Sequence, residues 1–253
     1  MALAQMSFFS RSLRQSTHLN VLLPDAGSGP FPVWYLLHGL SDDYSMWLRR
    51  TSLERYLAAL PLIVVMPDGG RGWYTNAQTP PGRAYEDHLV KDIMTFVDRL
   101  LPTIPRREGR VIGGLSMGGY GAVKLAFKHP ELFCAAASHS GVLMTPLHKP
   151  ESRSKELQLL HPEFESIFGS HWRGGPDDPV ALARACPIHL RPALYIDCGT
   201  NDFLLEQNRE FHAALDGLRI GHDYHEFPGD HQWDYWDTHV QDSLAFLRRA
   251  LRL

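Results

Sequence analysis

A serine lies between two glycines in the stretch Gly114-Leu115-Ser116-Met117-Gly118, after an apolar run and before a helix-compatible segment. Gly-x-Ser-x-Gly is the pattern of a nucleophile elbow, a sharp strand-to-helix turn that exposes the serine hydroxyl on a strained backbone. Side chains two residues before and after the serine would collide with neighbouring elements, and glycine avoids that collision. We therefore predict that Ser116 is an acyl-accepting nucleophile. The alternative is a glycine-rich packing turn with an incidental serine.

A serine hydroxyl needs a general base to remove its proton, and the base needs a third group to orient it. In an α/β protein with this elbow the chain order is serine, acid, histidine, and the later members should follow strands. Asp202 follows an apolar strand that ends at Gly199, and His231 follows a strand that ends near Phe227. These positions predict Asp202 as the acid and His231 as the base.

Other residues compete for these two roles. Asp197 lies inside a strand, so its side chain faces one surface of the sheet, and Asp230 directly precedes the predicted base. His225 also lies inside a strand, whereas His139 is near the sheet edge but precedes every candidate acid. His38 follows an early strand and is expected to shape its loop.

The tetrahedral intermediate of acyl transfer carries a negative oxygen that needs two preorganised N–H donors. One donor is the residue after the nucleophile, Met117. The second comes from the loop after the strand Val33–Leu37, where His38-Gly39-Leu40 supplies the candidates. In this role the backbone N–H matters and the side chain does not.

Apolar strand-like runs alternate with helical patterns along most of the chain, which predicts an α/β fold. The expected strands are 7–12, 17–23, 33–37, 62–67, 110–113, 133–138, 193–199 and 223–227, and the expected helices are 47–60, 89–101, 117–129, 203–215 and 236–253. The first two strands form an antiparallel edge, and the others form a mostly parallel central sheet with helices on both faces. Their carboxyl ends then meet at one edge, where ligands bind in such sheets.

Residues 142–188 interrupt this alternation with six prolines, a Gly174-Gly175 pair and clusters of charge. We expect a cap-like insertion above the sheet edge, with short helices at 164–168 and 179–185, because long excursions in compact domains are often lids. The alternative is a surface excursion that touches no substrate. We otherwise expect one domain over residues 1–253.

Composition narrows the classes of partner. Twenty-five basic and 28 acidic residues give a net charge of −3, and no basic run is interleaved with aromatic residues. Nucleic acid and anionic membranes are therefore not expected as partners. The 14 histidines and three cysteines form no HExxH pair and no zinc-type spacing, so neither metal nor cofactor is expected.

The sequence also bears on the compartment. Three cysteines do not describe a disulfide framework, and the first ten residues do not have the pattern of a signal peptide. No apolar run reaches the ~18 residues that span a membrane. We expect a cytoplasmic protein, with a secreted form whose signal has been removed as the alternative. Self-association into a homo-oligomer stays open.

With these residues in place, the chain resembles the esterase D-like branch of the α/β-hydrolases. This branch contains S-formylglutathione hydrolases, tributyrin, feruloyl and acetyl esterases and the antigen 85 mycolyltransferases, and the tributyrin-esterase-like members are the most similar. The matching segments are Tyr35-Leu36-Leu37-His38-Gly39-Leu40, Val65-Met66-Pro67-Asp68, Gly72-Trp73-Tyr74-Thr75-Asn76, Gly113-Gly114-Leu115-Ser116-Met117-Gly118-Gly119-Tyr120-Gly121, Gly199-Thr200-Asn201-Asp202-Phe203 and Gly229-Asp230-His231. The resemblance implies an α/β-hydrolase fold, a Ser116–Asp202–His231 triad and an oxyanion hole formed by the N–H groups of Leu40 and Met117.

Members of this branch cleave short-chain acyl esters or thioesters without a cofactor, so the resemblance implies a serine carboxylesterase acting on a small-molecule ester. Trp73 and Tyr74 follow a strand end and are predicted either to line the substrate pocket or to anchor their loop. An acyltransferase, an S-formylglutathione hydrolase and, least favoured, a non-catalytic binding protein are the alternatives.

Overall fold

The computed structural model describes residues 1–79, 82–144, 161–169 and 172–253. Its centre is an eight-stranded sheet with the order β1-β2-β4-β3-β5-β6-β7-β8. The strands are β1 (Ala2–Ser10), β2 (Gln15–Leu23), β3 (Val33–Leu37), β4 (Ile63–Pro67), β5 (Arg110–Leu115), β6 (Ala135–His139), β7 (Ala193–Gly199) and β8 (Asp223–Phe227). β1 and β2 pair antiparallel, β2 pairs antiparallel with β4, and the remaining strands are parallel. The predicted antiparallel edge and parallel centre are thus confirmed.

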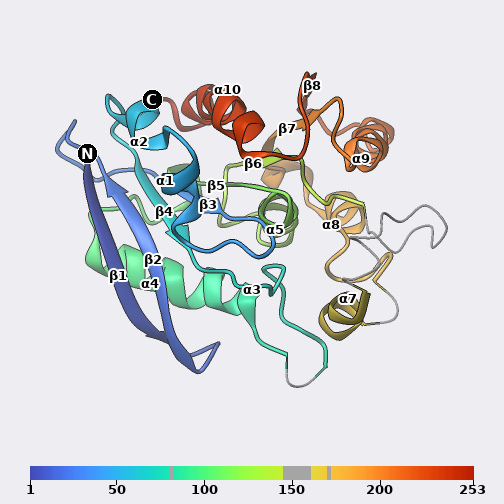
Figure 1. The fold of residues 1–253 in the computed structure, drawn as a ribbon, viewed down its shortest axis with the longest axis horizontal. Helices are drawn as coiled ribbons and strands as arrows, with labels where there is room; N and C mark the ends of the chain where they lie inside the picture. Colours follow the sequence, from blue (N-terminus) through green and yellow to red (C-terminus); the bar gives the residue numbers. More distant parts are fainter. Residues whose placement is uncertain (80–81, 145–160, 170–171) are drawn as a thin grey trace.

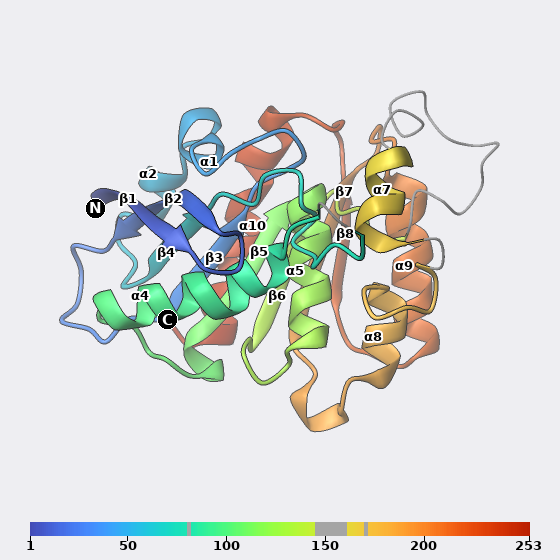
Figure 2. The ribbon, with the colours of Figure 1, turned by 90° about the horizontal axis from the view of Figure 1, so that it is seen from below.

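Helices cover both faces of the sheet (Figures 1 and 2). The helical segments are α1 (Met46–Arg50), α2 (Leu53–Leu57), α3 (Tyr85–Asp87), η1 (His88–Ile93), α4 (Met94–Leu100), η2 (Arg107–Gly109), α5 (Met117–Lys128), α7 (His161–Phe168), α8 (Pro179–Ala185), η4 (Ile188–Leu190), α9 (Leu205–Gly217) and α10 (Trp233–Leu251). One apolar cluster joins one face of the sheet to α4, α5, α8 and α9. The other cluster joins the opposite face to α1, α2 and α10.

Burial explains the sequence pattern of the strands. Every residue of β3, β4, β5 and β6 is buried, which accounts for their nearly continuous apolar runs. Exposure alternates along β1 and β8, because each of these edge strands has a solvent-facing side. The central strands therefore form the buried middle of the sheet, and the site lies at their carboxyl ends.

The prediction of one helix over 47–60 is wrong, because the structure has two helices there, α1 and α2. Thr51 between them has an extended backbone, with φ −131° and ψ 169°. The Asp237 carboxylate on α10 accepts the Ser52 N–H at 2.7 Å and the Tyr56 hydroxyl at 3.1 Å. This tertiary partner replaces the helical hydrogen bonds at the break.

Of the 142–188 insertion, the structure describes residues 142–144, 161–169 and 172–188, including α7 and α8. These two helices occupy the predicted places, and residues 145–160 and 170–171 lie outside the described ranges. Within the described ranges, no helix has the length and apolar character that a membrane crossing requires.

Candidate active site

Ser116 lies at the junction of β5 and α5, with φ 52° and ψ −114°. It is only half-buried, whereas the residues on either side of it are buried. A Cβ added to Gly114 would lie 2.7 Å from the Leu37 carbonyl oxygen, and one added to Gly118 would lie 2.5 Å from that oxygen. Only glycine therefore allows the elbow to pack against β3, as its spacing in the sequence predicted.

The three predicted catalytic side chains come together in one hydrogen-bonded chain. Ser116 Oγ lies 3.1 Å from His231 Nε2, and His231 Nδ1 lies 2.8 Å from Asp202 Oδ2. The Asp202 side chain is fully buried, and its Oδ1 accepts the Leu204 N–H at 2.8 Å. Since Nδ1–H donates to the carboxylate, Nε2 is the nitrogen free to accept the serine proton.

The competing acid and base are paired with each other elsewhere. His139 Nδ1 lies 2.7 Å from Asp197 Oδ2, and both side chains are fully buried. The other ring nitrogen of His139 lies 2.9 Å from Ser243 Oγ, and the Tyr235 hydroxyl donates to Asp197 Oδ1 at 3.0 Å. This pair lies directly behind the elbow, because the His139 carbonyl accepts the Ser116 N–H at 2.9 Å.

The remaining candidates are also placed. His38 is buried, with Nδ1 donating to the Gly39 carbonyl at 2.7 Å and Nε2 accepting the Gly69 N–H at 2.8 Å. Both its nitrogens therefore hold loops, as expected from the sequence. His225 and Asp230 are exposed, and neither takes part in the hydrogen-bonded chain of Ser116, His231 and Asp202.

The two residues predicted to supply oxyanion donors, Leu40 and Met117, lie near the serine in the chain or in the cavity wall. Met117 is the first residue of α5, and Leu40 lies in the loop after β3 that lines the cavity above Ser116. A Cβ on Gly39 would approach Ser116 Cβ to 3.7 Å, so this loop lies against the nucleophile. In the described ranges, neither the Leu40 nor the Met117 N–H donates a hydrogen bond within the protein. Both therefore stay candidates for the oxyanion donors predicted from the sequence.

A cavity of about 310 Å³ lies over Ser116 and His231. Four aromatic residues contribute to its wall: Trp73, Phe203, Trp233 and Trp236. The ring centroids of Phe203 and Trp236 lie 4.6 and 4.9 Å from that of His231, so both rings also pack against its imidazole. Asp42 is the acidic residue in the wall, and burial raises the pKa of its carboxyl.

The two aromatic residues predicted from the loop after β4 differ in position. Trp73 lines the cavity, whereas Tyr74 is buried behind it and donates its hydroxyl to the His38 carbonyl at 3.0 Å. Burial raises the pKa of the Tyr74 hydroxyl well above its ordinary value, so Tyr74 stays a neutral donor. Both residues have a positive φ, near 50°, which turns adjacent side chains in directions that sequence alone does not indicate.

The insertion reaches the cavity wall through α7. Phe164 and Phe168 pack on Trp73, with ring centroids 4.7 and 6.0 Å from it. Sequence reasoning did not identify Arg71, which pairs with Glu163 of α7 through Nε–Oε1 at 2.8 Å and Nη2–Oε2 at 2.7 Å. No local pattern could reveal this pair, because its members lie 92 positions apart.

Known proteins with similar sequences and structures include esterases and a serine hydrolase. The chain matches the model of the Esterase family, described as "Putative esterase", over residues 10–247. It is 26% identical to an acetyl esterase of Caldicellulosiruptor saccharolyticus, and the aligned region covers 99% of each chain. The structure of FphF, a fluorophosphonate-binding serine hydrolase of Staphylococcus aureus, is 29% identical, with a TM-score of 0.83 over 97% of each chain.

An S-formylglutathione hydrolase (FrmB) of Staphylococcus aureus is 28% identical, with a TM-score of 0.82 over 97% of this chain and 98% of that one. The family match, the fold and these neighbours lead to one assignment. The chain belongs to the Esterase family and is a carboxylic ester hydrolase of the serine type with an α/β-hydrolase fold, on the esterase D-like branch that its motifs resemble.

Proposed function

We propose that the protein hydrolyses short-chain acyl esters through an acyl-enzyme on Ser116. The observation that supports this most directly is the hydrogen-bonded chain from Asp202 through His231 to Ser116, next to an aromatic-lined cavity of about 310 Å³. This volume is at the small end of the range for ligand sites, which favours an acyl group of few carbons.

The reaction follows from the positions of the side chains. Ser116 Oγ attacks the ester carbonyl while His231 Nε2 takes its proton, and Asp202 orients the ring and stabilises its positive charge. His231 then gives the proton to the departing alkoxide. A water molecule, deprotonated by His231, attacks the acyl carbon and restores the serine. The N–H groups of Leu40 and Met117 are the proposed donors to the negative oxygen of each tetrahedral intermediate.

The natural substrate is proposed to be a small-molecule ester, and the reaction needs no cofactor. Transfer of the acyl group to an alcohol instead of water uses the same side chains, as does hydrolysis of a thioester such as S-formylglutathione. We further propose a cytoplasmic location, which is supported by the three cysteines, Cys134, Cys186 and Cys198, being free thiols.

A fluorophosphonate probe tests the nucleophile. Mass spectrometry of the labelled, digested protein should show one adduct, on Ser116, and Ser116→Ala should remove both the adduct and the hydrolysis of p-nitrophenyl acetate. Ser243→Ala is the matched control, because Ser243 also faces a histidine but is fully buried. An adduct elsewhere, or active Ser116→Ala protein, would overturn the proposal.

A substrate panel tests the acyl group. The panel contains p-nitrophenyl esters from acetate to laurate, methyl ferulate and S-formylglutathione, with and without an added alcohol acceptor. We expect kcat/KM to be highest for the shortest chains. A maximum at laurate would contradict the short-acyl proposal, and transfer products exceeding the free acid would assign the protein as an acyltransferase.

A further inference from the structure

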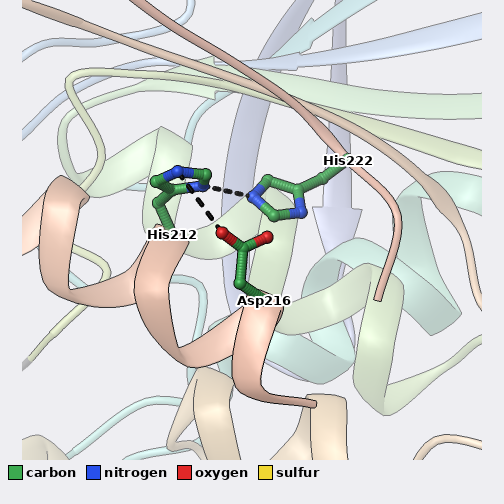
Figure 3. Close-up of side chains that lie close together, drawn as sticks. All are labelled: His212, Asp216 and His222. Carbon is green, nitrogen blue, oxygen red and sulfur yellow. Dashed lines mark hydrogen bonds and ion pairs between the residues drawn. The ribbon is translucent and has the colours of Figure 1, made fainter. Parts of the chain in front are cut away.

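Two histidines and an aspartate converge at the surface where α9 ends, away from the catalytic residues. His212 and Asp216 lie one turn apart on α9, and His222 lies in the segment that leads into β8. Figure 3 shows the three side chains turned toward one another. One ligand atom from each can be chosen so that all three lie within 4.8 Å of one another.

The orientation of His222 is fixed by a backbone partner. Its Nδ1 lies 2.8 Å from the Ile220 carbonyl oxygen. A carbonyl can only accept, so Nδ1 carries the hydrogen and the Nε2 lone pair points at the cluster. Ligating histidines in metal sites are held in the same way, with the distal N–H given to a carbonyl or carboxylate.

His212 is also held in place. Its ring stacks on Tyr224, with centroids 4.3 Å apart and an interplanar angle of 4°. Nδ1 lies 2.7 Å from His222 Nε2, and Nε2 lies 3.6 Å from Asp216 Oδ2. Two imidazoles and a carboxylate thus lie within one small space. Tyr224 orients the ring of His212, and the Ile220 carbonyl orients the ring of His222.

We propose that His212, Asp216 and His222 bind one divalent transition-metal ion, with Zn²⁺ the best match. Two imidazole nitrogens and one carboxylate oxygen suit this borderline ion, and water can complete a four-coordinate shell. Zn–N bonds of about 2.0–2.1 Å in a tetrahedral shell place two ligand nitrogens about 3.3 Å apart. The present nitrogens are 2.7 Å apart, so the rings must separate by about 0.6 Å. On binding, His212 Nδ1 gives up the proton that it donates to His222, and His212 Nε2 carries a proton instead. The metal then lies between His212 Nδ1 and His222 Nε2.

The position of this site in the chain predicts a structural role. α9 begins just after Asp202, and β8 ends just before the loop of His231. A metal bound to His212, Asp216 and His222 would therefore close the turn within the segment that carries both the acid and the base. None of the three ligands lines the cavity above Ser116. We expect the metal to raise the melting temperature without taking part in hydrolysis. This inference does not depend on the proposed substrate.

The test uses the full chain, stripped with EDTA and dialysed, and then titrated calorimetrically with ZnCl₂. His222→Ala removes a ligand, and Asp216→Asn removes another at an exposed position where the fold is not at risk. His189→Ala is the matched control, because His189 is exposed and outside the cluster. Co²⁺ in place of Zn²⁺ reports the coordination geometry through its visible absorption.

We expect one Zn²⁺ per chain, with affinity falling at least tenfold in His222→Ala and Asp216→Asn and staying unchanged in His189→Ala. At free Zn²⁺ about 100 times the dissociation constant, the melting temperature should rise by about 5–10 °C. Hydrolysis of p-nitrophenyl acetate should be equal before and after stripping. Absence of binding, binding that both ligand variants retain, or activity that requires the metal would each overturn the proposal.

Discussion

Of the three candidate carboxylates, Asp202 is the one hydrogen-bonded to His231. Its side chain is fully buried, one oxygen faces His231 Nδ1, and the other is held by the Leu204 N–H. Asp230 is adjacent to His231 in sequence but exposed. Asp197 is buried with His139 on the other side of the elbow. The hydrogen-bond geometry therefore separates three candidates that chain order alone could only rank.

Replacing this carboxylate tests its role. Asp202→Asn should lower kcat for p-nitrophenyl acetate by about 10⁴-fold, because the amide keeps the shape but favours the wrong imidazole tautomer. The melting temperature should report a folded protein. Asp230→Asn, one residue before the base, should stay within about twofold of wild type. Equal losses in the two variants would show that Asp202 does not orient the base.

At the scale of elements, strands were easier to predict than helix ends. Strands β7 and β8 were predicted with their observed bounds, because apolar runs bounded by glycine, proline or polar residues fix a buried strand. The break between α1 and α2 could not be predicted, since it depends on Asp237, 185 positions from Ser52. The different roles of Trp73 and Tyr74 likewise depend on a backbone turn with positive φ.

The loop after β3 and helix α7 are connected through Arg71. Its guanidinium makes two parallel hydrogen bonds with Glu163 on α7 and also donates to the Ser41 hydroxyl. Ser41 follows Leu40 and has a φ of 69°, an uncommon conformation for serine. Arg71 and Glu163 are about 40% exposed, so the pair contributes little to stability. We expect the pair to hold the loop that carries a proposed oxyanion donor, because Arg71 contacts Ser41 directly after Leu40.

Arg71→Ala should therefore reduce activity more than stability. We expect kcat/KM to fall by up to about tenfold, equivalent to about 1.4 kcal/mol, while the free energy of unfolding changes by less than about 1 kcal/mol. Arg209→Ala is the control. It removes a similar surface pair with two hydrogen bonds, between Arg209 on α9 and Glu226 on the edge strand β8. This control should keep the wild-type kcat/KM. If both variants lose the same activity, Arg71 has no specific influence on the loop.

At the scale of the molecule, one buried ionic cluster joins three distant segments. Glu86 of α3 lies 2.7 Å from Lys124 Nζ, 2.9 Å from Lys128 Nζ and 3.0 Å from His129 Nε2. Lys128 also reaches Asp177 of the insertion, at 2.8 Å. The sequence could not predict this cluster, because its members are scattered over 92 residues. The cluster connects α5, the helix that follows Ser116, to α3 and to Asp177 of the insertion.

The charge of Glu86 makes the stability of the whole fold depend on pH. Burial alone would raise the pKa of its carboxyl, but His129, Lys124 and Lys128 outweigh burial and hold the pKa far below the ordinary 4.5. A group whose pKa is lower in the folded state stabilises the fold fully above its unfolded pKa. This contribution is therefore complete above about pH 4.5 and is lost progressively as the pH falls below that value.

Glu86→Gln removes this linkage and takes from Lys124, whose side chain is fully buried, its nearer carboxylate, which leaves Asp177 at 3.7 Å. At neutral pH the variant should lose about 3–5 kcal/mol of unfolding free energy. Urea unfolding between about pH 7 and about pH 3 should show a constant difference from wild type down to about pH 4.5 and a shrinking difference below it. Glu206→Gln, at an exposed surface pair with Arg209, should track wild type throughout. A difference that stays constant to about pH 3 would mean that Glu86 is not the carboxylate responsible. Protonation of the wild-type side chain must reduce the difference in unfolding free energy between the two proteins.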